Sequence, residues 1–368
     1  MGTDGFVVSH RRVGGALSAL FSLTAAFLAG SCSSGGSGER EAASGLETHH
    51  FYLGESKLRS GDLAGALEHL RIYQQRAGEL AVRDPANRSY RLAEAYSYSN
   101  LAAIYQRQGN LHAANENFRQ SIALQDGLLA TSPDDVNLKH RRAVCLLHRG
   151  LILRALGQTT LAEHVLDAAL TETEAVTRIA PANADWLRDF AAAGVAAARL
   201  DLDRQRTIEA ITRLRLAGAI ISGLLRQDPE HAGMLRDQAN VHINLAAALR
   251  ATHQLGAASR EIEAAEKVVR RLPSSRDHDT LRRLAAVRAE TGAIAMERGD
   301  RWQATIDYEA AAGVLRLSIL ETRDHNVLDL WTRIMLALGR GFDARQTFAR
   351  LDEMGFREPS LMALRAPQ

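Results

Sequence analysis

Two kinds of polar side chain along this sequence could hold an extended peptide. Asn100 and Asn244 carry side-chain amides, which can both donate hydrogen bonds to a peptide backbone and accept them from it. Arg107, Arg154 and Arg250 carry guanidinium groups, whose planar fork matches the two oxygens of a carboxylate. Whether these five residues face one ligand depends on the elements that position them.

No catalytic or metal-binding spacing accompanies these residues. The stretch GRGFDA from Gly339 looks like a dinucleotide fingerprint, but such a motif must follow a strand, and LWTRIMLALG before it reads as helix. The thirteen histidines form no HExxH motif, and the two cysteines form no zinc-type pair. The arginine-rich stretches 204–215 and 268–284 have acidic neighbours, whereas a nucleic-acid groove needs a one-sided basic stripe. We therefore expect no enzyme activity, cofactor, metal, nucleic acid or small-molecule substrate.

The composition favours helices. The chain has 368 residues with only 7 prolines and 5% aromatic residues, and it is rich in Ala, Leu and Arg, which lose little on entering a helix. Its net charge of +2 creates no overall field that would draw the chain to nucleic acid or to a membrane.

Residues 1–31 are predicted to be a signal peptide, because a short basic segment precedes an apolar run over 13–29. The following LAGSC resembles a bacterial lipoprotein signal, in which the cysteine, here Cys32, is lipidated and becomes the first residue of the mature chain. It departs from that family at Ala29, where a large aliphatic residue is usual. The alternatives are cleavage without lipid, which would give a secreted protein, and an uncut N-terminal anchor. The Gly/Ser-rich residues 32–45 read as a flexible tether, which predicts a lipoprotein in the cell envelope facing the periplasm.

The rest of the chain has an internal period. Four prolines are each 48 residues apart: Pro85, Pro133, Pro181 and Pro229. Turn positions follow the same spacing and then shorten: Gly61, Gly109, Gly157, Gln205, His253, Gly299 and Gly339. Five residues after each turn the sequence always has alanine: Ala66, Ala114, Ala162, Ala210, Ala258, Ala304 and Ala344. A large apolar residue four positions later shares a helix face with that alanine, so each turn is predicted to join two helices of a hairpin.

This pattern closely resembles the tetratricopeptide repeat. The residues that carry the resemblance in the second repeat are Tyr105, Gly109, Ala114, Phe118 and Ser121. It covers residues 46–354, although the usual repeat has about 34 residues. The resemblance implies an all-α, right-handed superhelical solenoid of about seven antiparallel hairpins, with 355–368 as a C-terminal cap or tail. Each hairpin is expected to contact only its neighbours, as in a linear stack.

In that family the first helix of each hairpin lines the concave side. The resemblance therefore implies a peptide-binding groove. Its predicted residues are Tyr96, Asn100, Arg107, His148, Arg154, Arg199, Asn240, Asn244 and Arg250.

These features predict a non-enzymatic scaffold, tethered in the bacterial cell envelope, that binds a protein or an extended peptide. The alternative is a regulatory module of a signalling system, detached from a serine/threonine kinase. Long repeats of this kind resemble arrays found beside such kinases, but the chain contains no kinase domain.

Overall fold

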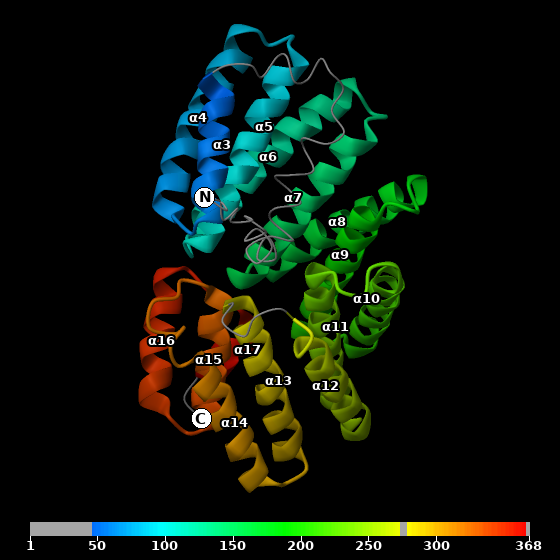
Figure 1. The fold of residues 1–368 in the computed structure, drawn as a ribbon, viewed down its shortest axis with the longest axis vertical. Coiled ribbons are helices and arrows are strands. Elements are labelled where there is room, and N and C mark those ends of the chain that lie inside the picture. Colours follow the sequence, from blue (N-terminus) through cyan, green and yellow to red (C-terminus); the bar gives the residue numbers. More distant parts are fainter. Residues whose placement is uncertain (1–45, 273–277, 366–368) are drawn as a thin grey trace, which may run out of the picture.

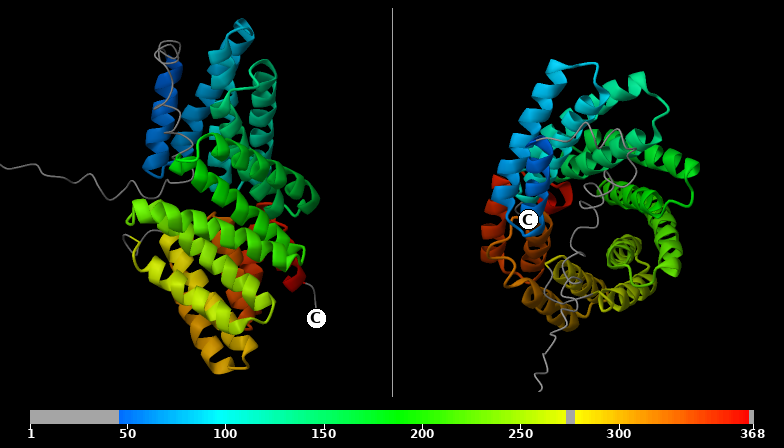
Figure 2. Two further views of the ribbon diagram at one scale, coloured as in Figure 1. Left: turned by 90° about the vertical axis from the view of Figure 1, so that its right-hand side faces the viewer. Right: turned by 45° about the horizontal axis from the view of Figure 1, so that its top comes forward.

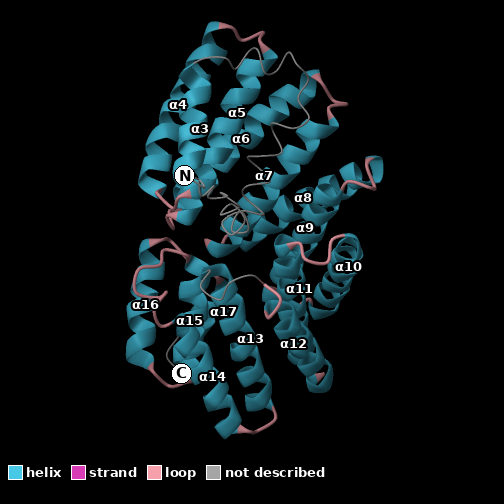
Figure 3. Cartoon of the chain, viewed as in Figure 1, coloured by secondary structure: helices cyan, strands magenta, loops and turns pink. Residues whose placement is uncertain are grey.

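A computed structural model of the chain describes residues 46–272 and 278–365. These residues form helices joined by short loops and contain no strand (Figure 3). The predicted signal peptide, Cys32 and the tether lie outside the described residues. Among the helices described, none is both long enough and apolar enough to cross a bilayer.

The helices pair into seven antiparallel hairpins that follow one another around a right-handed superhelix (Figure 1). The hairpins are α3 (Leu46–Arg59) with α4 (Leu63–Arg83), α5 (Arg88–Arg107) with α6 (Leu111–Thr131), α7 (Val136–Ala155) with α8 (Thr159–Ile179), α9 (Ala184–Asp203) with α10 (Thr207–Gln227), α11 (Ala232–Ala251) with α12 (Leu255–Val269), α13 (His278–Glu297) with α14 (Arg301–Leu315), and α15 (His325–Ala337) with α16 (Gly341–Glu353). A short helix, α17 (Pro359–Arg365), ends the described chain. The predicted all-α solenoid is confirmed.

Helix starts follow the spacing of the loop prolines because each proline is followed by a residue that caps the next helix. The Asn87 side chain accepts from the backbone N–H of Ser89 and of Tyr90, and the Asp135 side chain accepts from that of Leu138 at 2.9 Å. Such caps satisfy amides that have no partner inside the helix. The residues that begin α5, α7, α9 and α11 are therefore evenly spaced along the sequence.

All seven predicted turn positions adopt a left-handed backbone, which lets the first helix of a hairpin stop and reverse. Glycine holds five of them, with φ from +72° to +84°. Gln205 and His253 adopt the same conformation, with φ of 61° and 56°, although left-handed geometry is unfavourable for residues with a Cβ. The turn spacing, more than the glycine itself, therefore marks the repeat.

The alanine row is buried throughout, with every member at most 1% exposed. The first helix of the hairpin also needs a small residue where the second helix presents a large one. A Cβ at Gly150 would lie only 2.5 Å from the Leu166 side chain. These small residues let the two helices approach closely.

The array closes on itself, which corrects the expectation of a linear stack. The amide N of Arg357, after α16, donates to the carbonyl O of Ala155, at the end of α7, at 2.7 Å. One continuous buried cluster runs from Ala102 in α5 to Leu361 in α17. Figure 2 shows the hairpins arranged around a central space. Met354 and Arg357 lie against the turns at Gly109 and Gly157, which belong to the second and third hairpins. The C-terminal segment therefore packs against hairpins far from it in sequence.

Candidate functional site: the central cavity

Closure of the array produces a central cavity of about 590 Å³. Most of its lining comes from the first helix of successive hairpins, α5, α7, α9, α11, α13 and α15. Phe356, just before α17, also contributes. The cavity therefore combines side chains that are far apart in the chain.

The structure places the predicted groove residues on these first helices, but it does not bring all of them together. Those that line the cavity are Arg107, His148, Arg154, Arg199, Asn240 and Asn244. Tyr96, Asn100 and Arg250 are not part of the lining. The Tyr96 ring lies under the Arg141 guanidinium at 4.6 Å, and Asn100 is buried.

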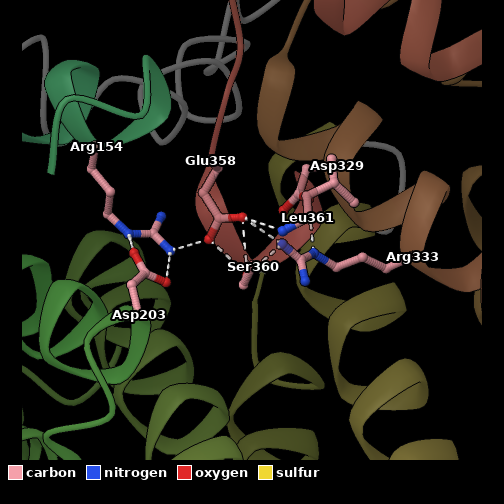
Figure 4. Close-up of polar contacts among 7 residues, drawn as sticks. All are labelled: Arg154, Asp203, Asp329, Arg333, Glu358, Ser360 and Leu361. Atoms are coloured by element: carbon pink, nitrogen blue, oxygen red, sulfur yellow. Dashed lines mark hydrogen bonds and ion pairs between the residues drawn. The ribbon is translucent and has the colours of Figure 1, made fainter. Parts of the chain in front are cut away.

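Arg154 is held by two carboxylates of this same chain (Figure 4). Its guanidinium donates to Asp203 at 2.5 and 2.9 Å and to Glu358 at 2.6 Å. Burial alone would lower the pKa of Arg154, but Asp203 and Glu358 raise it. Arg154 was expected to meet a ligand carboxylate, and the structure instead gives it internal partners.

Glu358 is the centre of this cluster and is only 2% exposed. Its carboxylate accepts from Arg154, from Arg333 at 2.7 Å and from the backbone N–H of Leu361 at 2.9 Å (Figure 4). Ser360 donates to it as well. Although burial favours the neutral acid, Arg154 and Arg333 hold the pKa of Glu358 at about 2. We call Arg154, Asp203, Asp329, Arg333 and Glu358 the clasp.

Arg250 also has internal partners. It donates to Glu290 at 2.6 Å and to Glu297 at 2.7 Å, and these two carboxylates raise its pKa against the effect of burial. Arg154 and Arg250, two of the three arginines expected to hold a ligand carboxylate, are therefore already paired within the chain.

Arg199 differs from these arginines. It lines the cavity from α9, and no hydrogen bond or ion pair joins it to any residue in 46–272 or 278–365. The charge on Arg154, together with burial, lowers the pKa of Arg199 to about 10. Asp329 and Glu358 attract it from a distance without contacting it. Arg199 remains protonated at neutral pH, so the cavity holds a guanidinium that no described residue binds directly.

The cavity histidines do not add to this charge. His148 and His325 are each 8% exposed, and burial lowers the pKa of both imidazoles. The His148 ring stacks on Phe118 with 5.7 Å between centroids. Both rings are therefore neutral at neutral pH, and the positive charge of the cavity comes from guanidinium groups alone.

Apolar side chains form much of the remaining lining. Leu151 of α7, Val195 of α9, Ile243 of α11 and Leu330 of α15 are half-buried there. No cluster of histidine, cysteine or carboxylate ligands suited to a metal occurs within the described parts of the chain. The site combines an apolar floor, two asparagines and charged groups, which suits recognition of a partly apolar, partly anionic ligand.

The sequence interpretation missed the acidic partners. Asp203 pairs with Arg154 and Asp237 pairs with Arg188, in each case 49 residues further along the chain. The 48-residue period could have predicted such pairs, because each acidic residue lies about one repeat after its arginine. Glu358 had no such signal, because it lies 204 residues from Arg154.

Comparison with known proteins rests on structure alone. No protein-family model matches this sequence, and no curated protein matches it. Among solved structures, the apo form of RapI superposes with a TM-score of 0.57 at 9% identity, covering 87% of this chain and 98% of its own. A Rap protein complexed with Competence and Sporulation Factor gives a TM-score of 0.55 at 13% identity, covering 89% of this chain and 80% of its own. BtubC (BKLC) from P. vanneervenii gives 0.51 at 18% identity, covering 70% and 93%.

The chain has a tetratricopeptide-like solenoid fold. Identities this low support the fold and do not transfer a partner or an activity. In this solenoid the inner face is the cavity described above, and its chemistry has to be read from its own residues.

Proposed function

We propose that this protein is a non-enzymatic scaffold whose central cavity binds an extended segment of a peptide or protein. The observation that carries the proposal is the cavity itself, whose lining combines an apolar floor, Asn240, Asn244 and Arg199, which has no ion-pair partner among the described residues. A volume of about 590 Å³ lies within the range of about 300–1,000 Å³ typical of ligand pockets. It suits a short peptide segment better than a folded domain.

Peptide backbones fit this lining. The Asn240 and Asn244 side chains come from one face of α11, since residues four apart are neighbours on a helix. Asn244 already donates to the carbonyl O of Asn240 at 2.7 Å, which fixes the orientation of its side chain. An oriented amide on an inner helix is a suitable partner for an extended backbone.

A substitution that fills the cavity tests whether the cavity is the binding site. Val195 is half-buried in the lining, and Val82 is 79% exposed near the end of α4, away from the lining. We expect Val195→Trp to abolish capture of a partner by the immobilised full chain, because the added indole occupies the cavity. The matched change Val82→Trp should leave capture intact.

The measurement is capture from solubilised cell envelope and from soluble extract, after circular dichroism has shown that both variants fold. Partners retained equally by Val195→Trp and wild type would place binding outside the cavity and contradict the proposal. Cavity-dependent capture from soluble extract alone would favour the regulatory module over the envelope scaffold.

We also propose that the scaffold is held at the membrane by a lipid on Cys32. The support is the LAGSC motif, followed by a Gly/Ser-rich stretch long enough to act as a tether. Changing Cys32 to Ser is expected to move the protein from the membrane pellet to the soluble fraction, because the lipid supplies the anchoring energy. Fractionation after a salt wash measures this. Continued pelleting of the Cys32→Ser protein would indicate an uncut anchor instead.

A further inference from the structure

We propose that Arg199 is the receptor for a carboxylate of an acidic peptide bound in the central cavity. This inference rests on the proposed function and specifies the ligand chemistry. It also revises the earlier interpretation, in which Arg107, Arg154 and Arg250 would hold the acidic groups.

The other cavity arginines are already engaged. Arg154 and Arg333 bind the clasp carboxylates, and Arg282 and Arg283 bind Asp279 at 3.2 and 2.5 Å. Arg236 lies 3.6 Å from the same Asp279, and Arg107 also makes an interaction within the described residues. Arg199 is thus the cavity arginine for which the described chain offers no counter-ion.

The charge balance of the cavity also favours an anionic ligand. Its lining contains seven arginines and four aspartates, namely Asp237, Asp279, Asp324 and Asp329. Asp203 and Glu358 are added through their bonds to Arg154, and Arg188 is added through its bond to Asp237, which gives six carboxylates for eight guanidiniums. The histidines are neutral, so the cavity wall has an excess of positive charge, and Arg199 contributes to it without an ion-pair partner among the described residues.

Arg199 makes no ion pair among the described residues that would stabilise the fold. The largest influence on its pKa is repulsion from Arg154, burial and the charge on Arg282 act in the same direction, and Asp329 and Glu358 oppose them. The pKa is lowered overall, so the empty cavity disfavours the charged form of Arg199, and an incoming anion would favour it. This is the arrangement expected of a binding group and not of a structural ion pair.

The clasp shows how the wall of this cavity holds a carboxylate. Glu358 reaches Arg154 from the chain segment just before α17 and is fixed by two guanidiniums and a backbone amide (Figure 4). Arg154 is therefore already bound by carboxylates of the same chain. The nearby Arg199 remains as the guanidinium available to a ligand.

The surroundings of Arg199 on α9 describe the rest of the ligand. Ala192 and Val195 lie about two turns and one turn before it on the same helix face, and both line the cavity. A side chain flanking the acidic group would lie on this strip, which favours small apolar residues next to the acid. The expected ligand is therefore an extended peptide with one acidic group among small apolar residues.

The test uses three synthetic peptides and isothermal titration calorimetry with the full chain. The first is acetyl-Ala-Ala-Glu-Ala-Ala-amide, the second has Gln in place of Glu, and the third is the Gln peptide with a free C-terminal carboxylate. We expect at least one acidic peptide to bind roughly 10- to 100-fold more tightly than the neutral one, because hydrogen bonds to charged groups are among the stronger ones. The stronger of the two identifies a side-chain or a chain-terminal carboxylate as the source.

Arg199→Gln should remove this preference, so that the acidic and the neutral peptides bind the variant with similar affinity. Arg199→Lys should restore part of it, since lysine keeps the charge but loses the fork. Arg215→Gln, on the exposed outer helix α10, is the matched control and should keep the full preference. Because Arg199 is repelled by its neighbours, Arg199→Gln is also expected to keep or raise the melting temperature, which a structural role would not allow.

Two outcomes would overturn the inference. Equal binding of all three peptides, lost in Val195→Trp, would leave the scaffold proposal standing and remove the carboxylate receptor. An acid preference that survives Arg199→Gln would assign the preference to another group. Failure of all three peptides to bind at millimolar concentration would count against both proposals. Comparing capture by Val195→Trp and by Val82→Trp would then decide whether the cavity binds any partner.

Discussion

Replacing Glu358 by alanine is expected to lower the free energy of unfolding by about 3–5 kcal/mol, because it removes a buried carboxylate and leaves two partly buried guanidiniums without their shared partner. Arg154 and Arg333 have side chains that are 11% and 30% exposed, so water cannot fully replace the lost partner. The backbone amide of Leu361 loses its acceptor as well. The urea midpoint, read by circular dichroism, measures the change.

Glu353→Ala is the control for this variant. Glu353 is exposed near the end of α16, and a surface change of this kind usually alters stability by less than about 0.5 kcal/mol. Equal effects of the two changes would mean that the clasp does not hold the array closed.

The stability difference between wild type and Glu358→Ala is expected to depend on pH. The folded pKa of Glu358 is about 2, below its ordinary value of about 4.3. A lowered carboxyl pKa stabilises the fold above the ordinary value, and that stabilisation is lost as the pH falls toward the folded value. The difference in stability between wild type and Glu358→Ala should therefore be constant near neutral pH and shrink between about pH 4 and pH 2. A difference that does not change over this window would contradict the charge-based account of the clasp.

Gly157→Ala is expected to cost about 2–5 kcal/mol, since it combines two penalties. The left-handed backbone of Gly157, with φ of +73°, is unfavourable for alanine by about 1–2 kcal/mol. A Cβ there would also lie 2.5 Å from the carbonyl O of Arg357. Overpacking of this kind typically destabilises a protein by about 1–3 kcal/mol. The Arg357 backbone cannot easily retreat, because its N–H is bonded to Ala155 at 2.7 Å.

The chain supplies a matched control at Gly339. Its φ is +72°, and a Cβ built on it meets nothing within 4 Å. Gly339→Ala should therefore show the backbone penalty alone, about 1–2 kcal/mol. The difference between the two variants in urea unfolding isolates closure of the array at hairpin α7–α8. Equal losses would show that the C-terminal segment yields without cost.

Closure changes how this solenoid should behave. In a linear stack each repeat contacts only its neighbours, so stability is a sum of local terms and ends can fray separately. Here the bond from Arg357 to Ala155 and the ion pair of Glu358 with Arg154 connect the C-terminal segment to the third hairpin. Glu358→Ala and Gly157→Ala both weaken that connection. Glu358 belongs to the C-terminal segment, and Gly157 belongs to the turn against which that segment packs.

The amino-acid sequence by itself determined the repeating unit. The turn spacing, the alanine row and the helix-capping residues specify local geometry, because a left-handed turn and a close helix contact each depend on a few residues near one another in the chain. Gln205 and His253 show the strength of this signal, since they occupy turn positions without being glycine and still adopt positive φ. Helical period also placed Arg107, Arg154, Arg199 and Asn244 correctly on the inner helices.

Only the tertiary structure decided which of those side chains are available to a ligand. Arg154, Arg199 and Arg250 have the same chemistry, and their availability depends on where carboxylates from other repeats arrive. Asp203 and Glu297 reach their arginines because successive hairpins stack with a fixed rotation. Glu358 reaches Arg154 because the superhelix turns far enough for its end to meet its third hairpin. That rotation accumulates from small packing angles between hairpins, which no local sequence pattern encodes. The clasp, the cavity and an Arg199 that is unpaired among the described residues therefore form only when the whole array is assembled.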